Sequence, residues 1–276
     1  LKAIASPGAR HESVPCFDDI DAMIAGAKID AITICTPPVG RYALAKTALE
    51  AGFPVMLEKP PGATVTEVQA LAALAKTKGV PLMTTWHSRE APGVATAKAW
   101  LEGKKIHAVR IEWRENVYRS HPGQEWIMSA GGDGVVDPGL NGLSIATHIL
   151  PDPLIVQSGV LDGPEGRQAP IAGELSLSCG DAPVSLALDF LREEQQIHMI
   201  EVDTDAGTLR MDDGGDILTL PDGPVPFGEE REYPRLYAAF ADLLARGESD
   251  VDLAPMQVVE DAFFLCERKQ VAPFRF

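Results

Sequence analysis

Short apolar runs alternate with amphipathic segments over the first 88 residues. Positions 29–35 and 54–57 are almost continuously apolar, as expected for strands that are buried on both faces of a parallel sheet. The pattern predicts strands at residues 1–5, 29–35, 54–57 and 81–85, and helices at residues 17–27, 41–51 and 64–78. Thr64 and Glu67 have the spacing of a capping box at the start of the last of these helices. Strands and helices that alternate in this way predict βαβ units around a parallel sheet, and therefore an α/β domain.

After about residue 103 the period of the apolar positions changes to two. Alternating segments predict strands at residues 106–113, 175–179, 184–190, 197–202 and 208–211. This pattern is typical of an open, predominantly antiparallel sheet with one covered face. A predicted helix at 138–149 can cover that face, and two further helices are predicted at 233–245 and 255–267. We therefore expect an α+β domain over residues 89–276, after the α/β domain of residues 1–88.

The 276-residue chain is acidic, with 40 aspartate and glutamate residues against 24 lysine and arginine residues and a net charge of −16. Such a charge repels a polyanion, so nucleic acid is not an expected partner. The sequence has no run of about 20 apolar residues that would cross a membrane, and its N-terminus lacks the pattern of a signal peptide. We therefore expect a cytoplasmic protein with no membrane partner.

The four cysteines are far apart in the sequence, and no pair of them has the spacing of metal ligands. They are Cys16, Cys35, Cys179 and Cys266. Most of them lie in apolar or alternating segments, which predicts buried, reduced thiols. The histidines are also dispersed, and no metal site is expected.

Lys59 stands between a short apolar run at 55–57 and the two prolines Pro60 and Pro61. A lysine at this place lies where a strand has just ended, and open α/β sheets bind their ligands at the carboxyl ends of the strands. Small or polar groups also follow the predicted strands of the first domain, namely Ser6, Thr36-Pro37-Pro38, Glu58 and Trp86-His87. Lys59 is therefore a candidate for chemistry, although a solvated lysine in a surface turn fits the same segment.

Asp137 precedes Pro138, and this order is typical of a helix N-cap followed by proline at the first helical position. Asp137 and Asn141 are also four residues apart on the predicted helix, so they face the same way. An acid and an amide one turn apart can bind a pair of sugar hydroxyls or orient a proton transfer. At this level both interpretations, the cap and the functional pair, stay open.

A third polar segment, residues 115–126, is dense in hydrogen-bonding groups. It contains Glu115, His121 and Trp126, whose ring offers an apolar face. The alternative to a binding segment is a long polar loop with a structural tryptophan. His107 and His198 lie in strand patterns, and we expect both to be structural.

Together these motifs resemble the glucose–fructose oxidoreductase / inositol dehydrogenase (Gfo/Idh/MocA) family. The segments that carry the resemblance are residues 36–38, 58–64, 85–89, 121–127, 137–141, 230–234 and 246–252. Within the family they are most similar to the bacterial L-arabinose and D-galactose 1-dehydrogenases. The resemblance covers nearly the whole chain.

The resemblance implies an NAD(P)-binding Rossmann domain over residues 1–88 and a substrate-binding domain over residues 89–276. It implies a homodimer formed through the open sheet of the second domain. It also implies oxidation of the anomeric carbon of an aldopyranose of the L-arabinose or D-galactose type to the lactone. The hydride would pass to the nicotinamide of NADP or NAD, with the protein orienting the reactants and managing the proton.

The resemblance also implies roles for individual residues. Lys59 would contact the reacting hydroxyl, and Asp137 would be its partner in deprotonation. The implied ligands of the sugar hydroxyls are His87, Glu115, His121 and Asn141. The implied contacts of the cofactor are Ser6, Thr36, Pro37, Pro38, Arg41, Glu58, Lys59 and Trp126.

Two departures from the family pattern concern the reaction. Many members have histidine where Asn141 stands, so the proton chemistry would rest on Lys59 and Asp137. Arg41 stands where a histidine often follows the Thr-Pro segment.

Another departure concerns the choice between NADP and NAD. Pro7 follows Ser6 where an arginine often binds the 2′-phosphate of NADP. There is also no acidic residue at Ser6 to bind the free 2′-hydroxyl of NAD. We expect NADP rather than NAD, with Arg10 as the substitute cation.

No G-x-G-x-x-G or G-x-G-x-x-A motif opens the chain, although the family places one in a first strand–turn–helix unit that binds the pyrophosphate. We therefore expect this first βα unit to be absent and the 276 residues to bind cofactor poorly. Two other functions stay open. One is a catalytically silent sugar-binding or regulatory protein that keeps the fold, and the other is a reductase for another carbonyl substrate.

Overall fold

The computed structural model describes residues 1–228 and 232–276. The chain divides into two compact units, which we call the first and the second unit. The first unit comprises Leu1–Thr85 and Tyr237–Asp252, and the second comprises Trp86–Leu236 and Leu253–Phe276. The division after Thr85 is close to the expected one after residue 88. Residues 237–252 differ from the expectation, because they belong to the first unit rather than to a domain spanning 89–276.

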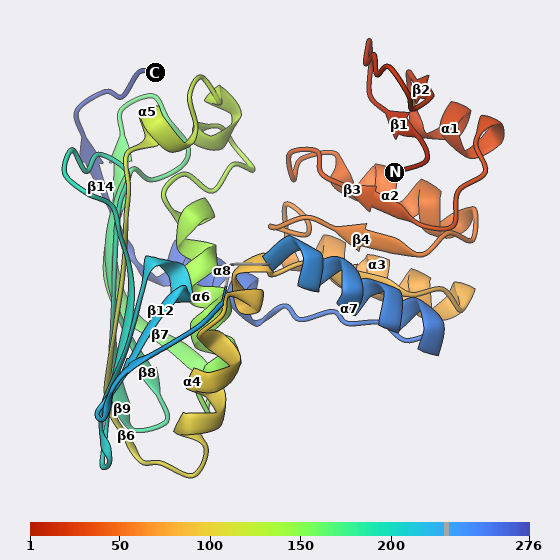
Figure 1. The fold of residues 1–276 in the computed structure, drawn as a ribbon. Helices are drawn as coiled ribbons and strands as arrows, with labels where there is room; N and C mark the ends of the chain where they lie inside the picture. Colours follow the sequence, from red (N-terminus) through yellow and green to blue (C-terminus); the bar gives the residue numbers. More distant parts are fainter. Residues whose placement is uncertain (229–231) are drawn as a thin grey trace. The chain divides into compact units, whose positions relative to one another are not determined.

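The first unit contains a parallel three-stranded sheet in the order β3-β4-β5 (Figure 1). Its elements are β3 (Ile32–Ile34), α2 (Arg41–Glu50), β4 (Val55–Leu57), α3 (Val65–Lys78) and β5 (Leu82–Thr84). A separate parallel pair is formed by β1 (Ile4–Ala5) and β2 (Cys16–Phe17), and α1 (Ile20–Gly26) follows it. Strand, helix and parallel strand succeed one another twice in the three-stranded sheet, as the apolar pattern predicts.

The ends of α3 follow from its sequence. Thr64 Oγ1 accepts a hydrogen bond from the Glu67 N–H at 3.2 Å, and Glu67 Oε2 accepts one from the Ala63 N–H at 3.0 Å. Gly79 ends the helix with a φ of 66°, a conformation that favours glycine. The predicted cap is confirmed, and it anchors the loop that runs from β4 into α3.

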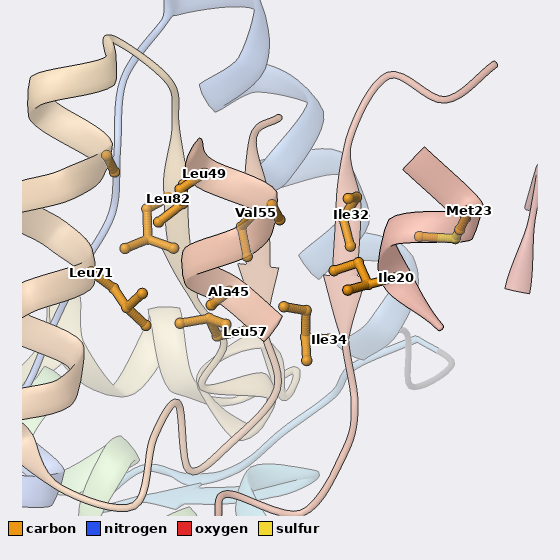
Figure 2. Packing of buried hydrophobic residues seen from close by; sticks show 12 residues of the cluster. Ile20, Met23, Ile32, Ile34, Ala45, Leu49, Val55, Leu57, Leu71 and Leu82 are labelled. Carbon is orange, nitrogen blue, oxygen red and sulfur yellow. The ribbon is translucent and has the colours of Figure 1, made fainter. Parts of the chain in front are cut away.

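The core of the first unit consists of apolar side chains from the strands and from the inner faces of the helices. Figure 2 shows side chains of α1, β3, α2, β4, α3 and β5 gathered in this cluster. Leu49, Leu57 and Leu71 are fully buried, and burial of such a side chain contributes about 1.5–3 kcal/mol. This packing fixes the strands whose carboxyl ends carry the predicted site residues.

Residues 249–252 pair with β5 inside the first unit. The Thr84 N–H donates to Asp250 O at 2.9 Å, and the Asp250 N–H donates to Leu82 O at 3.0 Å. The Leu82 N–H donates to Ser249 Oγ at 3.0 Å. These bonds satisfy backbone groups of β5 that would otherwise lie at a sheet edge. Backbone pairing, which a hydrophobic pattern does not reveal, therefore ties residues 249–252 to the first unit.

The second unit contains a nine-stranded sheet in the order β13-β12-β11-β10-β6-β9-β8-β7-β14. Its strands are β6 (Ile106–Arg114), β7 (Leu154–Pro164), β8 (Ala172–Cys179), β9 (Ala182–Asp189), β10 (Ile197–Thr204), β11 (Gly207–Asp212), β12 (Ile217–Leu220), β13 (Gly223–Val225) and β14 (Glu267–Val271). β6 is parallel to β9 and β7 is parallel to β14, whereas the other neighbours are antiparallel. The sheet is open and predominantly antiparallel, as predicted.

Helices cover one face of this sheet (Figure 1). α6 (Val136–Ile149) approaches the strands closely at two glycines. A Cβ on Gly139 would lie 2.8 Å from Leu188 of β9, and a Cβ on Gly142 would lie 2.6 Å from Trp113 of β6. α4 (Val94–Leu101) and α8 (Ala254–Leu265) pack against α6. The predicted cover of the sheet by the 138–149 helix is confirmed.

Short helices complete the second unit. They are η1 (His87–Glu90), α5 (Val117–Ser120), η2 (Glu125–Met128) and η3 (Asp213–Gly215). The first residues of α7 (Glu232–Arg246) belong to the second unit, and its residues from Tyr237 onward belong to the first.

Several details of the sequence prediction are wrong. α1 begins at Ile20 rather than at residue 17, because Asp19 caps it by accepting a hydrogen bond from the Ala22 N–H at 2.7 Å. α6 begins at Val136 after Val135, so Asp137 lies inside the first turn and is not the N-cap. Strand β7 was not predicted, because its buried and exposed positions alternate only over part of its length. Among the other elements, β2, α4, β12, β13 and β14 were not predicted either.

The cysteines are all free thiols, but they differ in exposure. Cys179 and Cys266 are buried, whereas Cys35 is exposed because it directly follows β3 at the end of the strand. The prediction of burial is therefore wrong for Cys35. Within residues 1–228 and 232–276, no group of three or more histidine, cysteine, aspartate or glutamate residues is arranged to hold a metal ion. In the same ranges, no helix is both long and apolar enough to span a membrane.

Candidate functional site

The backbone of Lys59 is fixed at the end of β4 in the first unit. The Glu58 N–H donates to Ile34 O of β3 at 3.1 Å, and the Lys59 N–H donates to Glu58 Oε1 at 2.8 Å. The peptide bond between Lys59 and Pro60 is cis. Pro60 is buried, whereas Lys59 itself is partly exposed. A fixed backbone therefore carries an accessible lysine at the carboxyl end of a parallel strand.

Arg41, the first residue of α2, joins the loops that follow β3 and β4. Its side chain is buried, with only 2% of the residue exposed. The guanidinium donates hydrogen bonds to three backbone carbonyls, those of Thr36, Glu58 and Pro60. The planar fork of arginine can serve several acceptors at once, which a lysine ammonium does less well. Arg41 thus fixes the carbonyls on both sides of Lys59, and its predicted contact with cofactor stays a prediction.

Small and polar residues stand at the strand ends of the first unit. Thr36 and Pro37 are exposed after β3, Pro38 is buried, and Ser6 is exposed after β1. Glu58 lies 3.4 Å from the Thr85 hydroxyl, which also donates to Leu57 O at 2.9 Å.

Open α/β sheets bind ligands at the carboxyl ends of their strands, and the contact of these residues with a dinucleotide stays a prediction. The sequence contains no glycine-rich motif of the kind that holds the pyrophosphate.

In the second unit, His87 has a carboxylate partner that the sequence does not reveal. His87 Nδ1 lies 2.9 Å from Glu232 Oε2, and the ring stacks on Tyr233 with centroids 5.6 Å apart. An ionised carboxylate only accepts hydrogen bonds, so Nδ1 is the donor and Nε2 of the neutral ring is an acceptor. Glu232 belongs to the 230–234 segment of the family resemblance, of which residues 230 and 231 lie outside the described residues.

Arg89 links η1, which carries His87, to α6. Its Nε donates to Ser144 O at 2.9 Å, and its Nη2 donates to Thr147 Oγ1 at 3.3 Å. Its guanidinium also lies 5.8 Å from the centroid of the Trp86 ring, within the range of a cation–π contact. Within the second unit, His87 is therefore tied to the helix that presents Asp137 and Asn141.

Asp137 and Asn141 lie one turn apart at the start of α6. Asp137 is buried, with 4% of the residue exposed, and Asn141 is partly exposed. The structure removes the capping explanation for Asp137, and the functional pair of Asp137 and Asn141 stays a prediction.

Glu115 and His121 meet at the carboxyl end of β6, and His198 of β10 joins them. Glu115 Oε2 lies 3.1 Å from His198 Nε2, and Glu115 Oε1 lies 3.6 Å from His121 Nε2. Burial of Glu115 disfavours its charged form. His121, His198 and Ser120 together outweigh that effect and keep the pKa of Glu115 below its ordinary value of 4.5. The cluster therefore holds an ionised carboxylate in a site that excludes most water.

The lowered pKa of Glu115 makes the stability of the fold depend on pH. A carboxyl group whose pKa is lower in the folded state contributes stability above its unfolded pKa, here about 4.5, and loses it as the pH falls below that value. Between about pH 6 and pH 3.5, the free energy of unfolding should therefore fall more for the wild type than for Glu115→Gln, which cannot titrate. Urea unfolding at both pH values measures this difference. Equal losses in the two proteins would contradict the assignment.

The loop that carries Trp126 folds tightly against itself before α6 begins. The Gly134 N–H donates to Ile127 O at 2.9 Å, and a Cβ on Gly132 would lie 2.2 Å from Trp126 O and 2.6 Å from Ile127 O. Both clashes involve backbone atoms, so side-chain rotation does not relieve them.

Gly132→Ala should therefore lower the free energy of unfolding by about 1–3 kcal/mol, the usual cost of overpacking. Urea unfolding measures this loss. Gly228→Ala is the matched control, because a Cβ there meets nothing within 4 Å. The same unfolding midpoint for both variants would contradict the expectation.

Each unit brings together part of the predicted set. The first unit gathers Thr36, Arg41, Glu58 and Lys59 at the ends of β3 and β4. The second unit gathers Glu115 and His121 and ties His87 to α6. Lys59 belongs to the first unit and Asp137 to the second.

Sequence reasoning missed Glu232 and assigned His198 a structural part. The 230–234 segment of the family resemblance was the one signal that pointed to Glu232.

Comparison with known proteins places these features in a family. Residues 2–86 match the model of the Gfo/Idh/MocA oxidoreductases, a family with an NAD-binding Rossmann fold. Over 288 residues the chain is 38% identical to the galactose 1-dehydrogenase of Pseudomonas fluorescens, which covers 99% of this chain and 90% of that protein. The chain belongs to the Gfo/Idh/MocA family of oxidoreductases. The first unit therefore contains its NAD-binding Rossmann domain.

Solved structures share this fold. A D-galactose-1-dehydrogenase from Rhizobium etli matches with a TM-score of 0.94 and 45% identity, over 100% of this chain and 89% of that chain. A 3-ketoreductase from Actinomadura kijaniata with NADP matches with a TM-score of 0.80 and 18% identity, over 98% of this chain and 91% of that chain.

A protein of gentamicin A biosynthesis with NAD gives a TM-score of 0.76 and 17% identity, over 91% of this chain and 80% of that chain. At such identities the last two structures show a shared fold alone. That fold occurs with either cofactor.

Proposed function

We propose that this chain is an NAD(P)-dependent aldose 1-dehydrogenase that oxidises the anomeric carbon of D-galactose to the lactone. The observation that carries the proposal is the 38% identity to a galactose 1-dehydrogenase over 99% of this chain. The match to the Rhizobium etli enzyme supports it. L-Arabinose is a second substrate of the proposal, because its pyranose ring differs from that of D-galactose only by lacking the hydroxymethyl group.

Lys59 and Asp137 are the proposed catalytic residues. Oxidation at the anomeric carbon removes a hydride from C1 and a proton from its hydroxyl group, and a bound nicotinamide supplies the hydride acceptor. The Lys59 ammonium contacts the hydroxyl oxygen and stabilises the negative charge that develops there. The Asp137 carboxylate takes part in removing the proton. The bonds from Arg41 to the carbonyls of Glu58 and Pro60 support this assignment, because they position Lys59 before substrate arrives.

The sugar hydroxyls are proposed to bind His87, Glu115, His121 and Asn141. A hydroxyl group both donates and accepts hydrogen bonds, so its site needs both kinds of partner. The ionised Glu115 carboxylate and His87 Nε2 offer acceptors, and the Asn141 amide offers a donor and an acceptor. Sites that bind hydroxyls by such paired groups discriminate strongly between sugars, because a missing hydroxyl leaves a buried group without a partner.

The cofactor is proposed to contact Ser6, Thr36, Pro37, Pro38, Arg41, Glu58, Lys59 and Trp126. For NADP, which the sequence favours, Arg10 is the proposed cation for the 2′-phosphate. Two copies of the chain are proposed to pair through the uncovered face of the nine-stranded sheet. That face carries ion pairs such as Arg110 with Glu201 and Arg114 with Glu174.

Absorbance at the reduced-nicotinamide band tests the proposal. Because the sequence contains no glycine-rich motif for the pyrophosphate, the protein is incubated at saturating NAD or NADP, and in a second series with the family's first strand–turn–helix unit fused before residue 1. Each series contains D-galactose, L-arabinose or D-glucose. We expect reduction with galactose and arabinose, faster with NADP, and slower reduction with glucose. Sugar binding without any reduction would favour the silent binding protein, and reduction of a carbonyl substrate without oxidation of any aldose would favour the reductase.

A further inference from the structure

His198 is placed where it can control a residue of the proposed sugar site. It lies in β10 directly opposite Trp113 of β6 in the antiparallel register. Its ring stacks on the Trp113 ring with centroids 4.3 Å apart and planes within 12°. Its Nε2 lies 3.1 Å from Glu115 Oε2. His198 therefore contacts both the buried Trp113 ring of β6 and the Glu115 carboxylate that follows the same strand.

The Trp113 ring, on which His198 stacks, is held tightly in place. Trp113 is 2% exposed, and a Cβ on Gly142 of α6 would lie 2.6 Å from its ring. The tryptophan ring is therefore held between the sheet and the helix that carries Asp137 and Asn141. Because the His198 ring lies flat on this surface, its plane and the direction of its Nε2 are fixed.

Glu115 has one engaged oxygen and one that lacks a hydrogen bond. An ionised carboxylate only accepts, so His198 must donate its Nε2–H to Oε2. Oε1 is buried and makes no hydrogen bond with any described residue, while His121 Nε2 lies 3.6 Å from it. A buried acceptor without a donor is costly, and a carboxylate more so than a neutral group. Oε1 is thus suited to accept a hydrogen bond from a ligand hydroxyl.

We propose that His198 is a positioning residue, which holds Oε2 of Glu115 so that Oε1 faces a hydroxyl group of the sugar. This inference rests on the proposed function, because it assigns a partner to a residue of that sugar site. His198 does not touch the substrate and acts through Glu115. It should affect the binding of the sugar more than the chemical step.

Two substitutions separate the hydrogen bond of His198 from its stacking. His198→Phe keeps an aromatic ring on Trp113 and removes the donor. His198→Gln keeps an amide N–H that reaches about as far as Nε2. His107→Gln is the matched control, because His107 lies exposed in β6 and takes no part in the proposed site.

His198→Phe should raise KM for galactose about 10- to 100-fold, the range for a lost hydrogen bond to a charged group. Its kcat should change by less than about threefold, because the bond acts on binding rather than on the step at C1. His198→Gln should restore KM to within about threefold of the wild-type value, and His107→Gln should leave KM unchanged. A KM of His198→Phe equal to that of the wild type would overturn the proposal.

A double-mutant cycle tests whether His198 acts through Glu115. In the Glu115→Gln background, His198→Phe should add less than about a twofold change in KM. If the two substitutions instead raise KM independently, so that their fold-changes multiply in the double variant, the proposal is overturned and His198 has a general structural role. If His198→Phe does not fold, His198→Asn replaces it. The asparagine amide is too short to reach Oε2 of Glu115, so this variant should show the same rise in KM.

Nitrogen NMR of histidine-labelled protein makes the test independent of activity. The His198 signal should show a protonated Nε2 in the wild type, and Glu115→Gln should shift it. An unshifted signal would overturn the inference even in an active enzyme. A shifted signal in a protein that reduces neither cofactor with any aldose would support the contact and defeat the proposed function alone.

Discussion

Lys59→Met should lower kcat with galactose by about 10²- to 10³-fold, the range for loss of a group that stabilises the charge developing in the transition state. Methionine keeps the length and the apolar part of the side chain but removes the ammonium group. The fold should stay intact, because the bonds that fix this segment come from the backbone of Lys59, Arg41 and the Glu58 carboxylate. Steady-state rates at saturating sugar and cofactor measure the effect.

Lys46→Met is the control for this prediction. Lys46 lies on α2 in the same unit, and its ammonium forms an exposed i,i+4 ion pair with Glu50. Solvent screens an exposed pair of this kind, so its loss should leave kcat and stability almost unchanged. A Lys59→Met enzyme as fast as Lys46→Met would refute the catalytic assignment of Lys59.

Arg41→Met should lower the free energy of unfolding by at least about 3 kcal/mol. The substitution leaves three carbonyls without a hydrogen-bond donor, and each unsatisfied carbonyl costs about 1–3 kcal/mol. Those carbonyls belong to Thr36, Glu58 and Pro60. Arg41→Lys should have an intermediate effect, since a single ammonium serves three acceptors less well than the arginine fork. Urea unfolding measures both variants.

The Arg41 variants should also lose activity, because the loop that carries Lys59 is no longer fixed. Lys76→Met is the control, since Lys76 is an exposed residue in the last turn of α3. It should unfold at the wild-type midpoint. An Arg41→Met protein with that same midpoint would show that the three carbonyls find other partners, and the proposed support of Lys59 would be wrong.

Local chemistry allowed much of the first unit to be predicted. The apolar runs of β3 and β4 and the cap of α3 at Thr64 depend on neighbouring residues in the sequence, and the structure confirms them. The position of Lys59 at a strand end follows from the same pattern. The burial of Arg41 does not, because arginine is rarely buried and its three acceptors come from two different loops.

The second unit shows why part of the site escaped prediction. His198 reaches Glu115 through the register of β10 on β6, which pairs His198 with Trp113 across 85 residues of sequence (198 − 113). A strand pattern gives the faces of each strand but not its partner or register. Glu232 meets His87 for a similar reason, since the contact spans 145 residues. The capping interpretation of Asp137 failed because α6 starts two residues earlier than proline placement suggests, at Val136 rather than at Pro138.

The measurement that tests the central claim most directly is the transfer of deuterium from D-galactose labelled at C1. The protein is incubated with the labelled sugar and NADP or NAD, and the reduced cofactor is analysed by mass spectrometry. The account predicts that the reduced nicotinamide carries the deuterium and that the sugar product is the lactone. Unlabelled reduced cofactor, or no reduction at all, would contradict hydride transfer from the anomeric carbon.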